Sequence, residues 1–182
     1  MKKILLMAAL MACVGAMAQG TVTFKNNVAG SFSAPVFNSD GVTKLAGNSF
    51  YAQLYANIGG SFSPLGSPTP FLANGFVSGG TVTVPAAGIV GGTVTLQMRA
   101  WEATSSGVAG SYEAALAGSK KVGISETFSV TPGDPSTSPP GVPANLVGLK
   151  SFSITGGSVI PEPSTIALGM VGAAALLLRR RK

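Results

Sequence analysis

The middle of the chain alternates apolar and polar residues with a period of two, which is typical of half-buried β-strands. The clearest run extends from Phe50 to Ile58, where the even-numbered positions are apolar and are expected to face a core. Its odd-numbered positions include Tyr51, Gln53 and Tyr55, which are expected to face solvent or a partner.

Five further strands are predicted between turns that contain Gly, Asn or Pro: Gly20–Lys25, Gly80–Val84, Thr93–Trp101, Val122–Val130 and Leu149–Thr155. In the fourth of these, Glu126 shares a face with Ile124, Phe128 and Val130, so we expect it to lie near an edge or to be paired. Many short strands separated by turns are typical of sandwiches and barrels. We therefore predict an all-β fold for residues 19–158, an antiparallel β-sandwich or jelly-roll-like domain.

Two segments depart from the strand pattern. A short helix is predicted over Ser111–Ala117, because Ser111 can cap it, Glu113 favours its first turn and Gly118 can end it. Residues 131–143 are rich in proline, which removes a donor from a β-ladder. This second segment is predicted to form a mobile loop or linker.

The N-terminus has the features of a secretory signal peptide, predicted over residues 1–18. Two lysines begin the chain and an apolar run follows. Ala16 and Ala18 fit the small-x-small rule of signal peptidase, so cleavage is predicted before Gln19. The alternative is lipoprotein processing at Cys13, but the residues before Cys13 match the recognition sequence for that processing poorly.

The C-terminus combines an uncharged apolar segment, residues 165–178, with the basic cluster Arg179, Arg180, Arg181 and Lys182. The segment is shorter than the roughly 20 apolar residues of an ordinary spanning helix, so we predict a short transmembrane helix. The basic cluster would stay in the cytoplasm and leave the body of the chain outside. A buried helix of the domain is the alternative, but the segment is apolar on all sides.

Pro161, Glu162 and Pro163 precede this apolar segment. With the apolar segment and the basic end, they resemble the PEP-CTERM sorting domain over residues 159–182. In that family an exosortase, a membrane-embedded processing enzyme, recognises the tail of exported proteins in Gram-negative-type bacteria. Many of these proteins are associated with extracellular polysaccharide and biofilm.

The resemblance implies signal peptidase and exosortase as processing partners, with Pro161, Glu162 and Pro163 as the recognition motif. It also implies an inner-membrane intermediate held by the C-terminal helix. The expected final location is the cell surface or the extracellular matrix. A permanently membrane-anchored protein with an uncleaved tail is the alternative.

The net charge of +6 arises at the two ends of the chain, because the middle contains six basic and five acidic residues. A nearly neutral domain cannot supply the counterion release that dominates nucleic-acid affinity, so nucleic-acid binding is excluded. Only 10% of all residues are charged. The surface is therefore expected to be neutral and polar.

The sequence offers few residues that could catalyse a reaction or bind a metal. The chain has no histidine, and its one cysteine lies in the signal peptide, so neither a Ser-His-Asp arrangement nor a zinc site of the usual ligands is expected. We predict no cofactor, no metal and no enzymatic activity. The alternative is a small carbohydrate-active enzyme that uses a pair of carboxylates, such as Glu102 and Glu113. The middle of the chain has five acidic candidates: Asp40, Glu102, Glu113, Glu126 and Asp134.

Two binding surfaces can be drawn from the sequence. Trp101, Tyr112, Tyr51 and Tyr55 are the candidates for an aromatic platform that stacks sugar rings; in the alternative, Trp101 anchors the core and the tyrosines cover a sheet edge. Three Thr pairs could instead form a flat ordered face: Thr21/Thr23, Thr81/Thr83 and Thr93/Thr95. The function that we predict is an exported, non-enzymatic surface or matrix protein that binds extracellular polysaccharide.

Overall fold

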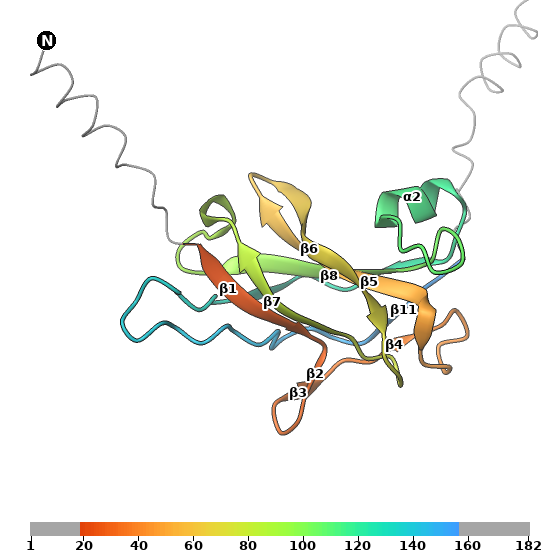
Figure 1. Cartoon of the computed structure of the whole chain (residues 1–182), viewed down its shortest axis with the longest axis horizontal. Coiled ribbons are helices and arrows are strands. Elements are labelled where there is room, and N and C mark those ends of the chain that lie inside the picture. The colour runs from red at the N-terminus through yellow and green to blue at the C-terminus, as the bar shows by residue number, and fades with distance from the viewer. Residues whose placement is uncertain (1–18, 157–182) are drawn as a thin grey trace, which may run out of the picture.

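The computed structural model describes residues 19–156, which form an all-β fold with little helix (Figure 1). The larger sheet has the order β10-β8-β5-β6, and β9 also pairs with β8. Its strands are β5 (Gly47–Ile58), β6 (Ser61–Phe71), β8 (Val94–Glu102), β9 (Val122–Ile124) and β10 (Phe128–Val130). A second sheet pairs β1 (Gly20–Lys25) with β7 (Ser78–Val84) in antiparallel register.

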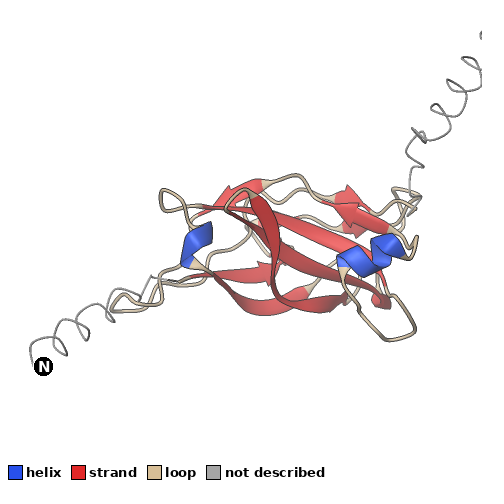
Figure 2. Ribbon diagram, turned by 90° about the horizontal axis from the view of Figure 1, so that it is seen from above, coloured by secondary structure: helices blue, strands red, loops and turns tan. Residues whose placement is uncertain are grey.

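The main core lies between these two sheets, and Figure 2 shows strands on both sides of it. Val22 and Phe24 of β1 pack in the same cluster as Leu54 of β5 and Met98 of β8. The even-numbered positions predicted to face inward in β5 and β8 do so, because a period of two places them on one side of the sheet. The fully buried members in these two strands are Ala52, Leu54, Ala56, Val94, Leu96, Met98 and Ala100.

The opposite face of β5 is also buried, which corrects the expectation that it faces solvent or a partner. Tyr51, Gln53 and Tyr55 are at most 8% exposed. The helix α2 (Tyr112–Ala117) and the segment before it cover this face of β5 and β8. A local pattern of alternation could not reveal this cover, because it comes from residues about 50 positions away in the chain.

The predicted strand Val122–Val130 is divided into β9 and β10, which pair with different parts of β8. Between them, Ser125 is buried and its hydroxyl accepts a hydrogen bond from the Met98 amide at 2.9 Å. The interruption turns Ile124 outward, with 44% of its surface exposed, which corrects its predicted place in the core. Glu126 is paired, as one of the two expectations stated, with Lys150 at 2.8 Å.

The strand β6 was not predicted, because Pro64 and Pro70 interrupt its pattern. It lies at the end of the strand order, where prolines are tolerated because no neighbour needs their missing amide hydrogens. Three very short strands were not predicted either: β2 (Asn27–Val28), β3 (Phe32–Ser33) and β4 (Val36–Phe37). The predicted strand Leu149–Thr155 is shortened to β11 (Phe152–Ser153). The pairing of β11 with β4 is parallel, so the fold is not purely antiparallel.

Residues 131–143 form a loop, one of the two alternatives predicted, and the loop is hydrogen-bonded to β1. Gly133 exchanges two backbone hydrogen bonds with Thr21 of β1, at 2.8 and 2.9 Å. Ala144 accepts a further hydrogen bond from the amide of Thr23. The segment therefore covers the edge of β1 that β7 leaves unpaired, and a covered edge cannot recruit another strand.

Two short helical segments lie at opposite ends of the molecule (Figure 2). The 3-10 helix η1 (Ala86–Gly88) follows β7, and α2 is capped by Ser111, whose hydroxyl accepts a hydrogen bond from the Ala114 amide at 3.1 Å. The predicted helix and its cap are thus confirmed. The described chain begins near the η1 end and finishes near the α2 end (Figure 1), where Thr155 pairs with Val122 of β9.

The signal peptide, the sorting motif, the apolar helix at 165–178 and the basic cluster lie outside the described residues. Within residues 19–156, the structure contains no helix of the length and apolar character needed to cross a bilayer.

Candidate functional site: a polar cleft beside an aromatic cluster

The four aromatic residues singled out from the sequence come together in one cluster on the outer face of the larger sheet. Tyr51, Tyr55 and Trp101 stand on β5 and β8, and Tyr112 comes from α2. The rings of Trp101 and Tyr112 meet edge to face, with their centroids 6.4 Å apart. This geometry suits the opposite charges of ring edge and ring face.

The cluster is buried, so these rings do not form an open platform for sugars. Trp101 is 0% exposed and Tyr55 is 1% exposed, and the other two rings are less than 9% exposed. A sugar ring cannot stack on an aromatic face that already contacts protein. The alternative stated for the sequence is confirmed for Trp101, which lies in the core, but the tyrosines are buried with it and do not cover a sheet edge, because β5 lies between β8 and β6.

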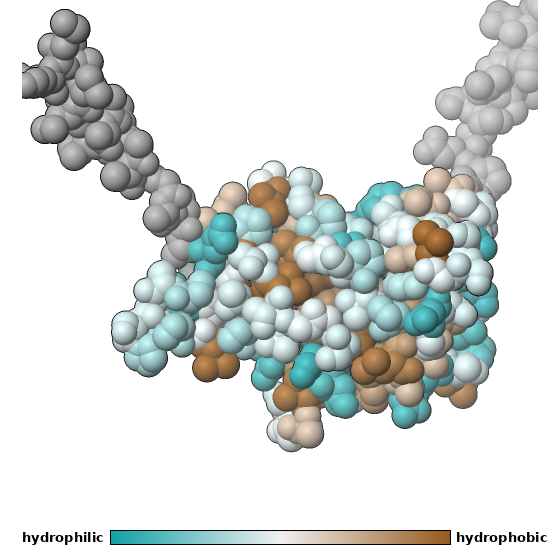
Figure 3. All heavy atoms as spheres, in the orientation of Figure 1, coloured by the Kyte–Doolittle hydropathy of each residue, from teal (hydrophilic) through white to brown (hydrophobic). Residues whose placement is uncertain are grey.

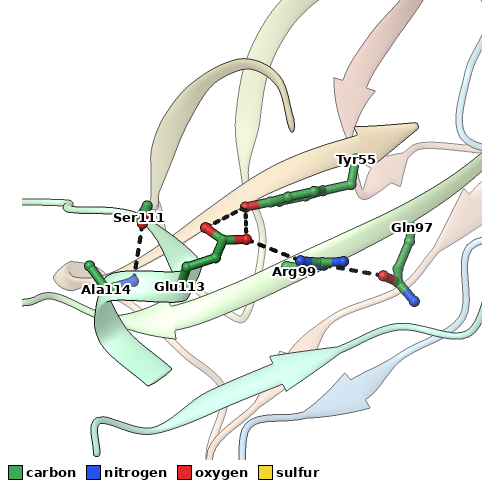
Figure 4. A network of polar contacts seen from close by, with 6 residues as sticks. All are labelled: Tyr55, Gln97, Arg99, Ser111, Glu113 and Ala114. Carbon is green, nitrogen blue, oxygen red and sulfur yellow. Dashed lines mark hydrogen bonds and ion pairs between the residues drawn. The ribbon is translucent and has the colours of Figure 1, made fainter. Parts of the chain in front are cut away.

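A polar network closes this cluster toward solvent (Figure 4). The guanidinium of Arg99 lies 4.1 Å from the centroid of the Tyr55 ring and 5.0 Å from that of Tyr112. It also forms an ion pair with Glu113 at 3.2 Å, and the Tyr55 hydroxyl donates to the same carboxylate. Arg99 of β8 thus holds α2 against the sheet through its ion pair with Glu113 and its contact with the Tyr112 ring, while the Tyr55 ring packs on it from β5.

Burial raises the pKa of Tyr55 to about 12, and the neighbouring Glu113 carboxylate adds to the rise, while Arg99 opposes it. Burial also raises the pKa of Tyr112. Both phenols are therefore neutral hydrogen-bonding groups over the physiological range, and neither is a ready nucleophile or base.

We expect the free energy of unfolding to fall as the pH rises from about 10 to about 12. In this window Tyr55 loses its proton in the unfolded chain, whose pKa is near 10.0, but keeps it in the folded protein. The folded state then binds more protons than the unfolded state, so the fold loses stability with rising pH. Denaturant titrations at stepped pH would measure the slope.

Tyr55→Phe should reduce that slope, and Glu113→Gln should shift the phenolate absorbance of the wild-type tyrosines toward lower pH. An unchanged slope in Tyr55→Phe would show that Tyr55 does not carry the effect.

A polar cleft opens beside the aromatic cluster, between the start of β5 and the segment that follows β8. Its volume is about 500 Å³, which is within the roughly 300–1,000 Å³ of ligand pockets. The lining side chains are Asn48, Ser49, Glu102, Ala103, Ser105, Ser106 and Lys120, together with the backbone of Gly107. Across the face shown in Figure 3, the surface is mostly pale or teal, with brown apolar residues in separate patches.

The aromatic cluster positions one wall of this cleft. The indole nitrogen of Trp101 donates to the carbonyl of Ala109 at 2.6 Å, and the Tyr51 hydroxyl contacts the carbonyl of Gly107 at 3.4 Å. The amide of Ala103 donates to the carbonyl of Ser49 at 2.9 Å, which joins the two walls at the floor. The cleft is therefore built into the fold and does not depend on a ligand to form.

Glu102 lies in the cleft with both carboxylate oxygens engaged. One oxygen is 3.6 Å from the ammonium of Lys120, and the other accepts from the amide of Lys121 at 3.5 Å. Glu113 pairs instead with Arg99, so the structure gives each glutamate of the candidate pair its own cation. Glu102 lines the cleft and Glu113 does not, whereas the two carboxylates of a glycosidase flank a single bond in one cleft.

The remaining acidic candidates serve local structure. Asp40 and Asp134 form turns, as predicted, and each carboxylate accepts hydrogen bonds from residues two or three positions ahead. These hydrogen bonds, of which that from the Thr43 hydroxyl is the strongest for Asp40, lower the pKa of both groups. Among residues 19–156, no group of three or more potential metal ligands is present.

The Thr pairs do not form one flat face. Thr21 and Thr23 lie opposite Thr83 and Thr81 on paired strands, but the third pair belongs to the other side of the fold. Thr21 and Thr23 are also half-buried, with their hydroxyls directed to carbonyls of the 131–143 segment. Their hydroxyls therefore satisfy a neighbouring backbone and are not presented to solvent as an array.

The residues that line the cleft were not singled out from the sequence, apart from Glu102. Asn48, Ser49, Ser105 and Ser106 are small polar residues in turn-like stretches, which resemble many other stretches of this chain. What distinguishes these residues from other small polar residues is their position around one cleft, which no periodicity or spacing in the sequence indicates.

Comparison with known families identifies the C-terminal segment. The model of the PEP-CTERM protein-sorting motif matches residues 159–182. The chain carries a PEP-CTERM sorting domain. This PEP-CTERM tail indicates exosortase-dependent sorting of an exported protein in Gram-negative-type bacteria. No curated protein and no solved structure matches the chain.

Proposed function

We propose that this PEP-CTERM protein is a non-enzymatic component of the cell surface or extracellular matrix, with a β-sandwich ectodomain that associates with extracellular polysaccharide. The match of the PEP-CTERM motif to residues 159–182 carries the proposal, because it assigns the route by which the domain leaves the cell. The two sheets that enclose the main core support the sandwich architecture.

The placement of the acidic residues supports a non-enzymatic role. Each of the three glutamates in the described chain is paired with a different cation. The two aspartates are engaged in turns. Glycoside hydrolysis needs two carboxylates that flank one bond, about 5 to 10 Å apart, and such a pair would have to share a cleft.

The fold is anchored close to the tail. Ile154 is 0% exposed in the main core, and Thr155 exchanges backbone hydrogen bonds with Val122 at 2.8 and 3.0 Å. The PEP-CTERM match begins at residue 159, only four positions later. At about 3.5 Å per extended residue, the domain lies within about 20 Å of the motif. Processing therefore takes place beside a folded domain.

The first experiment is the intact mass of the native protein from fractionated cells, with peptide mapping of both termini. We expect a chain that begins at Gln19 and has lost the basic cluster Arg179–Lys182, in the surface or extracellular fraction. A chain that still carries this cluster in the inner membrane would make the protein a permanent anchor and would contradict the proposal.

Glu162→Ala is expected to leave the unprocessed form in the inner membrane, because it removes the only charge among Pro161, Glu162 and Pro163. Ser158→Ala, one residue before the match, is the control and should be processed like the wild type. Equal processing of both variants would show that the exosortase does not recognise Glu162.

A further inference from the structure

The polar cleft beside the aromatic cluster is formed by residues outside the PEP-CTERM match, and its lining is unusual for a ligand pocket. Such pockets are mostly lined by apolar and aromatic side chains. Here the only apolar lining residue is Ala103, which is 8% exposed. The rest of the lining consists of hydroxyl, amide, carboxylate and ammonium groups and the Gly107 backbone.

The two charges in the cleft neutralise each other. Glu102 and Lys120 form an ion pair at 3.6 Å, and their side chains remain 34% and 37% exposed. A ligand in the cleft would therefore meet no net charge, which disfavours a polyanion or a cation. The carboxylate can still accept hydrogen bonds, and the ammonium can still donate them, because each has free positions.

The remaining polar side chains have free hydrogen-bonding capacity. Within the described part of the chain, the side chains of Asn48, Ser49, Ser105 and Ser106 form no hydrogen bond with protein, and all four are exposed. Hydroxyl and amide groups both donate and accept. Closely spaced groups of this kind match a ligand that offers several hydroxyls in a fixed arrangement.

We propose that this cleft binds sugar units of an uncharged polysaccharide through Asn48, Glu102, Ser105, Ser106 and Lys120. A sugar offers the adjacent hydroxyls that these groups can pair, and it needs no deep apolar pocket. The inference rests on the proposed matrix role, which supplies the polymer. Trp101 and Tyr51 are positioning residues, since they hold the wall of the cleft and do not touch the sugar.

No aromatic ring lines the cleft, so each site binds weakly, with dissociation constants in the millimolar range. Weak sites are effective on a polymer, because neighbouring units and neighbouring protein copies raise the effective concentration. The cleft therefore suits retention in a matrix better than capture of a free sugar.

The test is a titration of isotope-labelled native protein with cellotetraose, maltotetraose and chitotetraose, followed by amide chemical shifts. At least one of these probes should shift the amides of Ser49, Glu102 and Ser106. Ser106→Leu, which removes a hydroxyl and places a branched apolar side chain in the cleft, should weaken binding by about tenfold, equal to about 1.4 kcal/mol. Asn48→Ala, which only removes an amide, should weaken it by a smaller factor.

Ser67→Leu is the matched control, because Ser67 is also an exposed serine but lies on β6 and does not line the cleft. It should leave binding unchanged. Shifts confined to another surface, or no shift with any of the three probes, would overturn the assignment. So would wild-type affinity in both cleft variants, or tighter binding of an oligogalacturonate than of the neutral probes.

The outcome is separable from that of the proposed function. Terminal mapping can confirm export and processing while the cleft fails to bind, in which case only the sugar site is wrong. Binding at the cleft of a protein that keeps its tail would leave the sugar site standing and contradict the sorting proposal. Release of new reducing ends from any probe would instead support the enzymatic alternative for Glu102.

Discussion

Replacing Asn26 by leucine is expected to lower the free energy of unfolding by about 3 to 6 kcal/mol, because three buried backbone groups each lose a hydrogen bond and only the Gly75 carbonyl keeps another, from the Val36 amide. Asn26 is 0% exposed. Its amide donates to the carbonyls of Ala34 and Gly75 at 2.9 and 2.8 Å, and its oxygen accepts from the amide of Val77 at 2.8 Å. The total free energy of unfolding of a folded domain is only about 5 to 15 kcal/mol.

The side chain joins three segments at the point where the β1–β7 ladder and the β2–β3 ladder end. Gly75 is one of them, and its φ of +75° and its close approach to Val36 leave no room for a Cβ, which would lie 2.5 Å from the Val36 oxygen. The Asn26 side chain thus supplies the hydrogen bonds that a neighbouring strand would supply, because the backbone at Gly75 turns too tightly to join a ladder.

Asn26→Asp should be at least as damaging, because a carboxylate cannot donate to the two carbonyls and would bring a buried charge. Asn27→Ala is the control, since Asn27 is exposed and next in the chain, and should change stability by no more than about 0.5 kcal/mol. Urea denaturation of each purified variant gives the values. Equal stability of Asn26→Leu and wild type would refute this account of the buried amide.

Replacing Trp101 by alanine should cost about 3 to 5 kcal/mol of stability, the range for loss of a large buried aromatic. The ring is 0% exposed and contacts Tyr112, and its nitrogen donates to Ala109. The change therefore removes both the packing of α2 on the sheet and the anchor of the cleft wall. Equilibrium unfolding followed by circular dichroism would measure the loss.

Trp101→Phe helps to separate the two contributions, because it keeps a buried aromatic ring while it removes the indole hydrogen bond and part of the ring volume. We expect a smaller loss, of about 1 to 2 kcal/mol, together with weaker sugar binding. Trp101 is the only tryptophan of the chain, so its fluorescence reports this cluster in the wild type. A native emission typical of an exposed indole would contradict the buried position.

Much of the fold could be predicted from local patterns. The strand Gly20–Lys25 and the helix capped by Ser111 were placed to within a residue, because alternation and capping are properties of neighbouring residues. The pattern failed where a strand breaks at Ser125 or contains proline, as β6 does. In both cases the neighbouring strand decides the outcome, and its position is not encoded locally.

The candidate site was predictable only in part. The residues Trp101, Tyr112, Tyr51 and Tyr55 were correctly selected as a group that meets in space, but their burial reverses the surface role first considered for them. Whether an aromatic ring on a strand faces solvent depends on what covers that face. Here the cover is a six-residue helix whose docking depends on Arg99 and Glu113.

Two properties follow from contiguous stretches of the sequence: the PEP-CTERM tail, which is a continuous motif, and the all-β body, whose strands show a period of two. Three others are properties of the folded domain: which polar residues share a cleft, which face of β5 is closed, and the cover of the β1 edge by the 131–143 segment. These properties depend on contacts between residues up to about 120 positions apart, and such contacts are decided by the packing of the whole domain.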